Sequence, residues 1–163
     1  MGRRNHLRHC IITAMAMIAV MLASCTTDKV YDTYIHTETE GWEKNEDIVF
    51  NIDSLKEGGT YSLILGVRLS DTYPFKNLHM VVDQTIYPGQ QHLQDTVTCH
   101  VASRNGTMLG HGVSLYQYDM PLRRHTYHQG DSISIKVRHN MKREILPGIA
   151  DVGIILKNNN RIK

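Results

Sequence analysis

The sequence has little cysteine, little aromatic character and no long apolar run. Only one of its three cysteines, Cys99, lies beyond residue 25, so the later part of the chain cannot form an internal disulfide. Aromatic residues make up 7% of the chain, with a single tryptophan. The longest apolar run covers residues 11–22, which is too short for a membrane-spanning helix of about 20 residues. The fold must therefore be held together by its hydrophobic core.

The first 25 residues have the organisation of an export signal. Three arginines, at positions 3, 4 and 8, precede the apolar run, and small residues follow it, as in a signal peptide. Residues 22–25 read Leu-Ala-Ser-Cys, which resembles the lipobox of bacterial lipoproteins. The resemblance implies a signal peptide over residues 1–24, cleavage before Cys25 and lipidation of the Cys25 thiol. An ordinary signal peptide with an incidental cysteine is the alternative. Several acyl chains make a lasting anchor, so a domain tethered to a membrane is predicted.

The charge of the chain gives no sign of a nucleic-acid partner. The formal net charge is +2 with histidine neutral, and removing the three arginines of residues 1–24 leaves +2 − 3 = −1. No basic excess then remains to attract nucleic acid or anionic lipid. The 139 residues from 25 to 163 suit one domain with a proper core.

Short runs of alternating apolar and polar residues recur from residue 47 onward. The clearest run is DSISIKVRH, residues 131–139, in which Ile133, Ile135 and Val137 alternate with polar residues. Period two predicts strands with one buried side and one solvated side. Turn-forming pairs such as Pro88–Gly89 separate the runs. We therefore predict an all-β fold, a single antiparallel β-sandwich (Ig-like or jelly-roll-like) of about seven or eight strands, with an eight-stranded barrel as the alternative.

The polar segment before these runs predicts a connection rather than part of the domain. Residues 25–46 contain isolated aromatics among polar residues and are interpreted as the lipidated N-terminus and tether. The β-sandwich domain is then predicted over residues 47–163.

The sequence predicts no catalytic residue, metal ligand or cofactor. The closest histidine pair after residue 25, His125 and His128, would face opposite sides of a strand, whereas metal ligands must converge. Cys99 shares an apolar register with Val97 and Val101, which predicts a buried small side chain rather than a nucleophile. We therefore expect that the protein is not an enzyme.

Four aromatic residues remain as candidates for a binding surface or for the core: Trp42, Tyr116, Tyr118 and Tyr127. An exposed aromatic ring on a sandwich can stack on a sugar, whereas a buried ring anchors the core. Both interpretations stay open from the sequence. The first would make the protein a carbohydrate- or peptidoglycan-binding module.

Four stretches of the chain resemble one known family. They are YDTYIHTETEGWEKNEDIVFNI (31–52), RLSDTYPFKNLHMVV (68–82), DTVTCHVASRNGTMLGHG (95–112) and RHNMKREILPGIADVGIIL (138–156). In this order and spacing they resemble the gliding motility lipoprotein GldH family of the Bacteroidota, over roughly residues 30–157. The last stretch is the most specific, with Met141–Arg143, Leu146–Ile149 and Asp151–Gly153. Gly41–Trp42 and the run with Arg68, Tyr73–Pro74 and Asn77–Leu78 match the family as well. Met108–Leu109 departs from the family, which usually has an aromatic residue there.

The resemblance implies a cell-envelope lipoprotein that works with partner lipoproteins in gliding and in the linked protein secretion system, without enzymatic activity. Its expected partners are the membrane, through the lipid anchor, and other envelope lipoproteins or gliding and secretion components. Thr26 follows the cysteine where inner-membrane lipoproteins of enterobacteria have aspartate. We therefore expect a periplasm-facing position at the outer membrane, with the inner membrane as the alternative.

Overall fold

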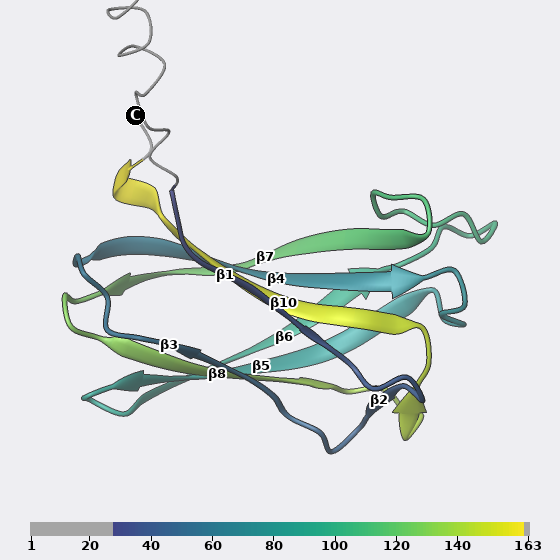
Figure 1. Cartoon of the computed structure of the whole chain (residues 1–163), viewed down its shortest axis with the longest axis horizontal. Helices are drawn as coiled ribbons and strands as arrows, with labels where there is room; N and C mark the ends of the chain where they lie inside the picture. Colours follow the sequence, from purple (N-terminus) through teal and green to yellow (C-terminus); the bar gives the residue numbers. More distant parts are fainter. Residues whose placement is uncertain (1–27, 162–163) are drawn as a thin grey trace, which may run out of the picture.

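The computed structural model describes residues 28–161, which form two packed antiparallel sheets and one small sheet (Figure 1). The first sheet has the order β1-β10-β4-β7 and the second has the order β3-β8-β5-β6. The small sheet pairs β2 with β9. The strands are β1 (Lys29–His36), β2 (Trp42–Glu43), β3 (Ile48–Ile52), β4 (Gly59–Ser70), β5 (Asn77–Tyr87), β6 (Gln91–His100), β7 (Leu115–Tyr127), β8 (Ser132–His139), β9 (Ile145–Leu146) and β10 (Ile149–Asn158), followed by a 3₁₀ turn, η1 (Asn159–Arg161).

The all-β antiparallel sandwich predicted from the alternating runs is confirmed. Within residues 28–161 each four-stranded sheet is open and ends in two edge strands, so the barrel alternative is wrong. Ten strands are present in this part of the chain, more than the seven or eight predicted, because β1 and the two-residue strands β2 and β9 carry no clear alternating signal.

The core lies between the two sheets and follows the predicted alternation. Ile133, Ile135 and Val137 of β8 are buried, whereas Lys136 between them is exposed. The same holds for β4, whose inward side chains are Tyr61, Leu63, Leu65, Val67 and Leu69, all at most 2% exposed. A period of two places every second side chain on the same side of a strand, so each strand contributes one face to the core.

The tether predicted over residues 25–46 is too long. Residues 29–36 form β1, which pairs with β10 from Lys29 to His36, and Trp42–Glu43 form β2. Tyr31 and Ile35 of β1 pack against the core. The domain therefore begins at least as early as Lys29, and not at residue 47.

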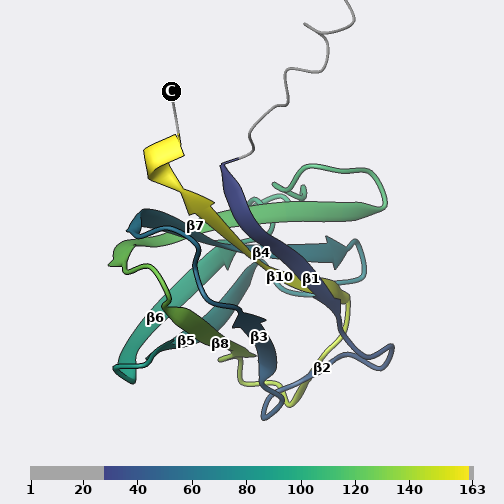
Figure 2. The ribbon, with the colours of Figure 1, turned by 60° about the vertical axis from the view of Figure 1, so that its left-hand side comes forward.

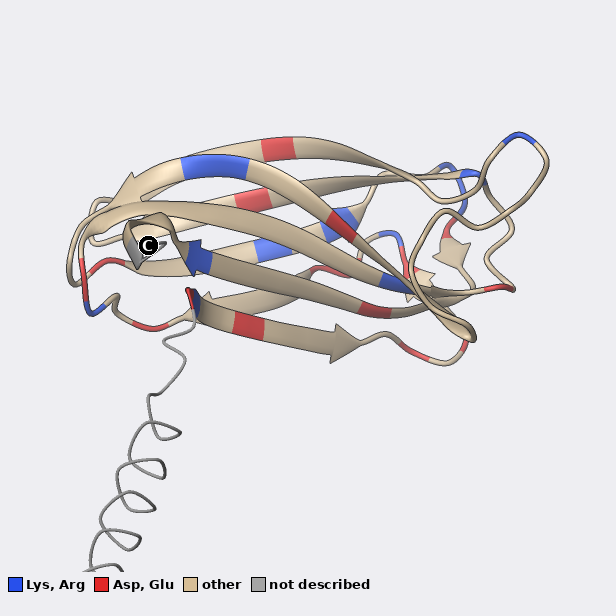
Figure 3. Ribbon diagram, turned by 90° about the horizontal axis from the view of Figure 1, so that it is seen from above, with Lys and Arg blue, Asp and Glu red and all other residues tan. Residues whose placement is uncertain are grey.

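The two ends of the sandwich differ. Strand β1 starts at the same end at which β10 finishes, beside η1 (Figure 2). At the opposite end, here called the distal end, β1 finishes and leads into β2, and the β4–β5 and β6–β7 connections also lie there (Figure 1). Positively and negatively charged segments are interspersed along the ribbon in the view of Figure 3.

Candidate functional site

The outer face of the β1-β10-β4-β7 sheet carries a tyrosine that lies over two glycines. Gly153 of β10 and Gly66 of β4 are direct cross-strand partners, and Tyr34 of β1 is opposite Gly153. A Cβ atom would come within 2.6 Å of Tyr34 Cγ at position 153 and within 2.9 Å of Tyr34 Cζ at position 66. Only glycine leaves room for the ring here, as expected for a glycine inside a strand. The ring therefore lies flat along the sheet.

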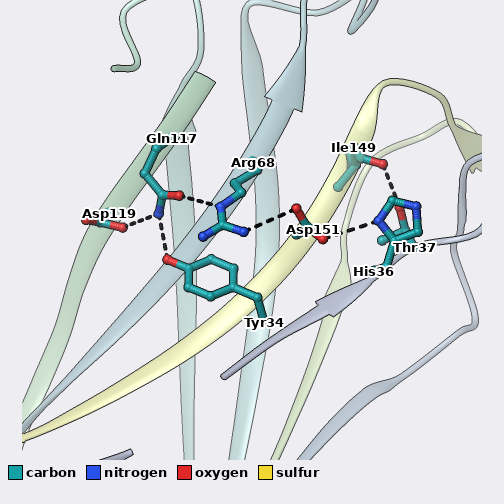
Figure 4. Close-up of polar contacts among 8 residues, drawn as sticks. All are labelled: Tyr34, His36, Thr37, Arg68, Gln117, Asp119, Ile149 and Asp151. Carbon is teal, nitrogen blue, oxygen red and sulfur yellow. Dashed lines mark hydrogen bonds and ion pairs between the residues drawn. The ribbon is translucent and has the colours of Figure 1, made fainter. Parts of the chain in front are cut away.

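Arg68 of β4 and Gln117 of β7 hold this tyrosine from the far side of β10, which lies between β1 and β4 (Figure 4). The Arg68 guanidinium stacks over the Tyr34 ring, with Cζ 4.1 Å from the ring centroid, and its Nε donates to Gln117 Oε1 at 2.9 Å. Gln117 Nε2 donates to the Tyr34 hydroxyl and to Asp119 Oδ1, both at 2.6 Å. These contacts use the donors and the acceptor of the Gln117 amide and so fix its orientation. Burial raises the pKa of the Tyr34 phenol, which therefore stays protonated and can also donate.

Asp151 extends the network toward the distal end. Its carboxylate lies 3.5 Å from Arg68 Nη1 and 3.2 Å from His36 Nδ1. Beside it, the Thr37 hydroxyl donates to the Ile149 carbonyl at 2.5 Å, which ties the end of β1 to β10 (Figure 4). We refer to Tyr34, His36, Arg68, Gln117, Asp119 and Asp151 as the outer-face network.

The outer-face network is ordered but remains accessible. The side chains of His36 and Arg68 are 74% and 41% exposed. Exposed ion pairs contribute at most about 1 kcal/mol to stability because water screens them. The outer-face network therefore adds little to the stability of the fold. It does present hydrogen-bond donors and acceptors in fixed positions, as a protein-binding surface requires.

The aromatic residues proposed from the sequence do not form a surface. Trp42 is fully buried, its Nε1 donates to the Glu46 carbonyl at 3.1 Å, and its ring meets the His139 ring edge-on. Tyr118 is buried and donates to the Val101 carbonyl at 2.8 Å. Tyr127 is also buried, and burial raises its pKa to about 12. Tyr116 packs against the core and is only partly buried. The sugar-stacking interpretation of Trp42, Tyr118 and Tyr127 is therefore wrong.

Cys99 has the environment of a core residue. It is 2% exposed, and burial raises the pKa of its thiol to about 12. It is therefore a thiol rather than a thiolate at neutral pH, and a thiol is a poor nucleophile. Within residues 28–161, no three histidine, cysteine, aspartate or glutamate side chains are grouped so as to hold a metal ion.

Among the histidines of residues 28–161, only His139 is buried. It is 2% exposed, with Nε2 3.2 Å from the Trp42 carbonyl oxygen and Nδ1 3.4 Å from the Met141 backbone nitrogen. The two contacts assign a neutral ring that donates from Nε2 and accepts at Nδ1. Burial lowers the pKa of His139. Sequence analysis did not single out this residue.

Sequence analysis also missed most of the outer-face network. Tyr34 and Gln117 are 83 positions apart in the chain, and their contact depends on how the four strands of the sheet align. Gly66 and Gly153 could have served as a signal, because a glycine inside a strand marks a close approach to the backbone. Arg68 and Asp151 were noted as parts of family motifs, but without a role.

Cys25, the predicted lipidation site, lies outside the residues that the structure describes. Between residues 28 and 161, no helix has the length and apolar character needed to cross a membrane. The fold and the site together define an all-β domain whose candidate functional feature is an ordered outer surface.

The chain belongs to the GldH lipoprotein family, whose model matches residues 29–156. It is therefore a membrane-associated lipoprotein of the cell envelope. The chain is also similar to the gliding motility lipoprotein GldH of Flavobacterium johnsoniae, with 28% identity over 150 residues that cover 85% of this chain and 91% of that protein.

Similarity to solved structures is weak. A family 35 carbohydrate-binding module from Clostridium thermocellum has 12% identity and a TM-score of 0.38, covering 77% of this chain and 89% of the module. Latent PorU from Porphyromonas gingivalis has 9% identity and a TM-score of 0.33, covering 83% of this chain and 14% of PorU. At these TM-scores neither similarity indicates a function.

The motifs that carry the family resemblance come together at the distal end. A Cβ atom on Gly148 would come within 2.5 Å of the Tyr73 backbone nitrogen, and one on Gly41 within 2.6 Å of the Leu146 carbonyl oxygen. Both glycines have positive φ, +79° and +122°, a region that favours glycine. Trp42 pairs with Leu146 in the small sheet. The family motifs thus build the distal end and the adjoining part of the outer-face network.

Proposed function

We propose that this chain is a lipid-anchored component of the gliding machinery or of the associated secretion machinery, and that it acts by binding other envelope proteins rather than by catalysis. The observation that carries the proposal is the outer-face network. It holds a cation, two carboxylates and a tyrosine hydroxyl in fixed positions on an accessible sheet. Such groups give a protein interface its register and specificity.

The anchor in this proposal is the acylated Cys25, and the expected location is the periplasm-facing side of the outer membrane, with the inner membrane as the alternative. Gliding as the process is suggested by the similarity to the Flavobacterium johnsoniae protein, which is named for gliding motility. The carbohydrate-binding alternative loses support because three of its four aromatic residues are buried.

A matched pair of variants tests the proposal. Arg68 pairs with Asp151 on the outer face of the first sheet, and Arg138 pairs with Asp83 on the outer face of the second sheet. The two pairs are chemically alike, and both arginines are partly exposed. Arg68→Ala and Arg138→Ala should therefore cost similar, small amounts of stability.

Partner binding is measured by chemical crosslinking in native envelopes followed by purification of the tagged full-length protein. We expect Arg68→Ala to remove the crosslinked partner and to reduce motility or secretion in a complemented deletion strain, while Arg138→Ala leaves both unchanged. Equal behaviour of the two folded variants would contradict a binding role for the outer-face network. Turnover of an envelope substrate that depends on the purified domain would contradict the non-catalytic proposal.

A further inference from the structure

The two four-stranded sheets have four edge strands, and three of these are blocked or short. On β6, Arg123 Nη2 donates to the Gln94 carbonyl at 3.2 Å and also binds the Asp95 carboxylate. Strand β7 contains Pro121, and its free side at Gln117 is paired with His111 by backbone hydrogen bonds of 3.0 and 2.8 Å. Strand β3 has only five residues. These are recognised ways of protecting a sheet edge from further pairing.

Strand β1 is different, because it has eight residues and no proline. Its register shows which backbone groups face outward. Thr37 N donates to the Ala150 carbonyl at 3.1 Å, in line with the register of β1 on β10. In an antiparallel pair the hydrogen-bonded positions alternate. The N–H and C=O groups of Asp32, Tyr34 and His36 therefore face away from β10, toward the free edge.

The backbone groups on the free edge of β6 follow from its register in the same way. Val101 N donates to the Lys76 carbonyl at 2.8 Å, so alternation places the backbone groups of Gln94 and Thr96 on the free edge of β6. Arg123 does reach the Gln94 carbonyl. Strand β6 is thus covered at this position, whereas within residues 28–161 no side chain donates in this way to the backbone of β1 from Asp32 to His36.

The space beside β1 suits the side chains of an added strand. Strand β1 lies next to β3 of the other sheet. The groove there is lined by the apolar and aromatic side chains of Val30, Tyr31, Ile52 and Tyr61 and by the polar or charged side chains of Lys29, Asn51, Asp53, Ser54, Lys56 and Glu57. Tyr31 and Ile35 point inward and are only partly buried. A strand added to β1 would place every second side chain over these apolar groups, and the other side chains beside the outer-face network.

We infer that β1 is the docking edge for an extended segment of another envelope protein, with apolar side chains at alternate positions, which adds to the sheet as a further strand. This inference rests on the proposed function and names the surface and the type of partner. The main-chain hydrogen bonds supply affinity and the alternate side chains supply specificity, as in other strand additions.

A second copy of this chain is the competing occupant. A twofold dimer through antiparallel β1 strands would send the two N-terminal segments out at opposite ends of the paired strands. Four residues lead from Cys25 to Lys29, which is about 14 Å at full extension. Connections this short cannot easily anchor both copies in one membrane when they leave from opposite ends of the paired strands. A strand supplied by a different protein is therefore favoured over a second copy.

The first test uses a photo-crosslinking amino acid in the full-length lipidated protein in living cells. It is placed at Val30, Asp32 or, as a control on the β6 edge, Thr96. We expect crosslinks from Val30 and Asp32 to residues two positions apart on one segment of one partner, and none from Thr96. Crosslinks between two copies of this chain, or scattered crosslinks without such a register, would overturn the inference.

The same experiment separates this inference from the proposed function. Crosslinks to a partner from position 68 or 117, with none from β1, would refute β1 as the docking edge. They would leave the proposed function unaffected. If no position on the domain crosslinks to any protein, both fail.

The second test removes one outward-facing amide from each of two edges. Asp32→Pro and Thr96→Pro each remove an N–H that faces the free edge, which an edge strand tolerates. We expect Asp32→Pro to reduce crosslinking from position 30 about tenfold, because backbone pairing is lost, and Thr96→Pro to leave it unchanged. Asp32→Ala keeps the amide, so an equal loss in that variant would overturn the backbone role.

If Asp32→Pro fails to fold, hydrogen exchange on the wild-type domain decides. The probe is a synthetic peptide with the sequence of the crosslinked segment. The amides of Asp32, Tyr34 and His36 should become protected when the peptide is added. Unchanged exchange at these three amides would overturn the inference.

Discussion

The ring of Tyr34 lies against the backbone of Gly153, on the partner strand, so closely that no side chain fits between them. Gly153→Ala should therefore displace Tyr34 and break its hydrogen bond with Gln117. We expect a loss of about 1–3 kcal/mol in the free energy of unfolding, as in other overpacked sites. Gly89→Ala is the control, because a Cβ atom there meets nothing within 4 Å, and it should change stability by at most about 0.5 kcal/mol. Urea unfolding measures both variants.

A double-mutant cycle identifies Tyr34 as the obstructing group. In a Tyr34→Ala background the space above position 153 is open, so Gly153→Ala should cost markedly less than in the wild type. The same cost in both backgrounds would show that the backbone, and not the tyrosine ring, makes the glycine necessary.

The register of β8 predicts opposite behaviour for adjacent residues. Ile135 is fully buried, so Ile135→Ala should destabilise the domain by about 2–5 kcal/mol. Lys136 lies on the other face with its side chain 54% exposed, in a surface ion pair with Asp47, so Lys136→Ala should cost at most about 0.5 kcal/mol. Similar losses for the two variants in thermal or urea unfolding would refute this register.

The fold could be predicted from the sequence wherever a strand has one buried face. In β8 and β4 the alternation is complete, because each strand lies inside its sheet and buries every second side chain. Strand β1 was missed for the opposite reason. It is an edge strand whose inward residues, Tyr31, Thr33 and Ile35, are only partly buried, so polar and apolar residues are mixed and the segment resembles a linker.

The candidate site could be predicted only in fragments. Arg68 and Asp151 are 3.5 Å apart between Nη1 and Oδ2, but no local pattern brings them together. Their contact follows from the pairing of β10 with β4, in which Asp151 is opposite Arg68. Sheet registers of this kind join residues far apart in the chain, and a single sequence does not show which strands are neighbours.

Trp42 was left open between a sugar-binding surface and the core, and the structure places it in the core. Trp42→Ala should therefore cost about 3–5 kcal/mol of stability, as for other large aromatic residues removed from cores. Titration of the wild-type domain with envelope polysaccharides should leave the Trp42 emission unshifted. A variant with an unchanged melting temperature and lost polysaccharide binding would contradict the buried position.

His139 should make the stability of the domain depend on pH. Burial lowers its pKa in the folded state below the ordinary histidine value of about 6.5. Above that value the ring is neutral in both states and its contribution to stability is complete. As the pH falls below 6.5, the unfolded chain binds a proton that the folded state resists, so stability decreases until the lower, folded pKa is reached.

His139→Gln removes this titration while keeping a side chain that can donate to the Trp42 carbonyl. The difference in unfolding free energy between wild type and variant, measured from pH 8 to pH 5, should shrink as the pH falls. A constant difference across this range would show that His139 is not the residue responsible.

The lipid anchor is predicted at Cys25, and the domain contains a second cysteine that serves as a control. Cys25→Ala should abolish incorporation of labelled fatty acid and leave an uncleaved precursor or a released domain, because only a thiol can form the thioether to the lipid. Cys99 is buried, and its thiol pKa is raised to about 12 by burial, so it should not be acylated. Cys99→Ala should therefore keep the label, although it removes part of the core. Fatty acid still entering Cys25→Ala would show that the anchor is elsewhere. Because Lys29 already belongs to β1, an acylated Cys25 would hold the sandwich within about 14 Å of the membrane surface.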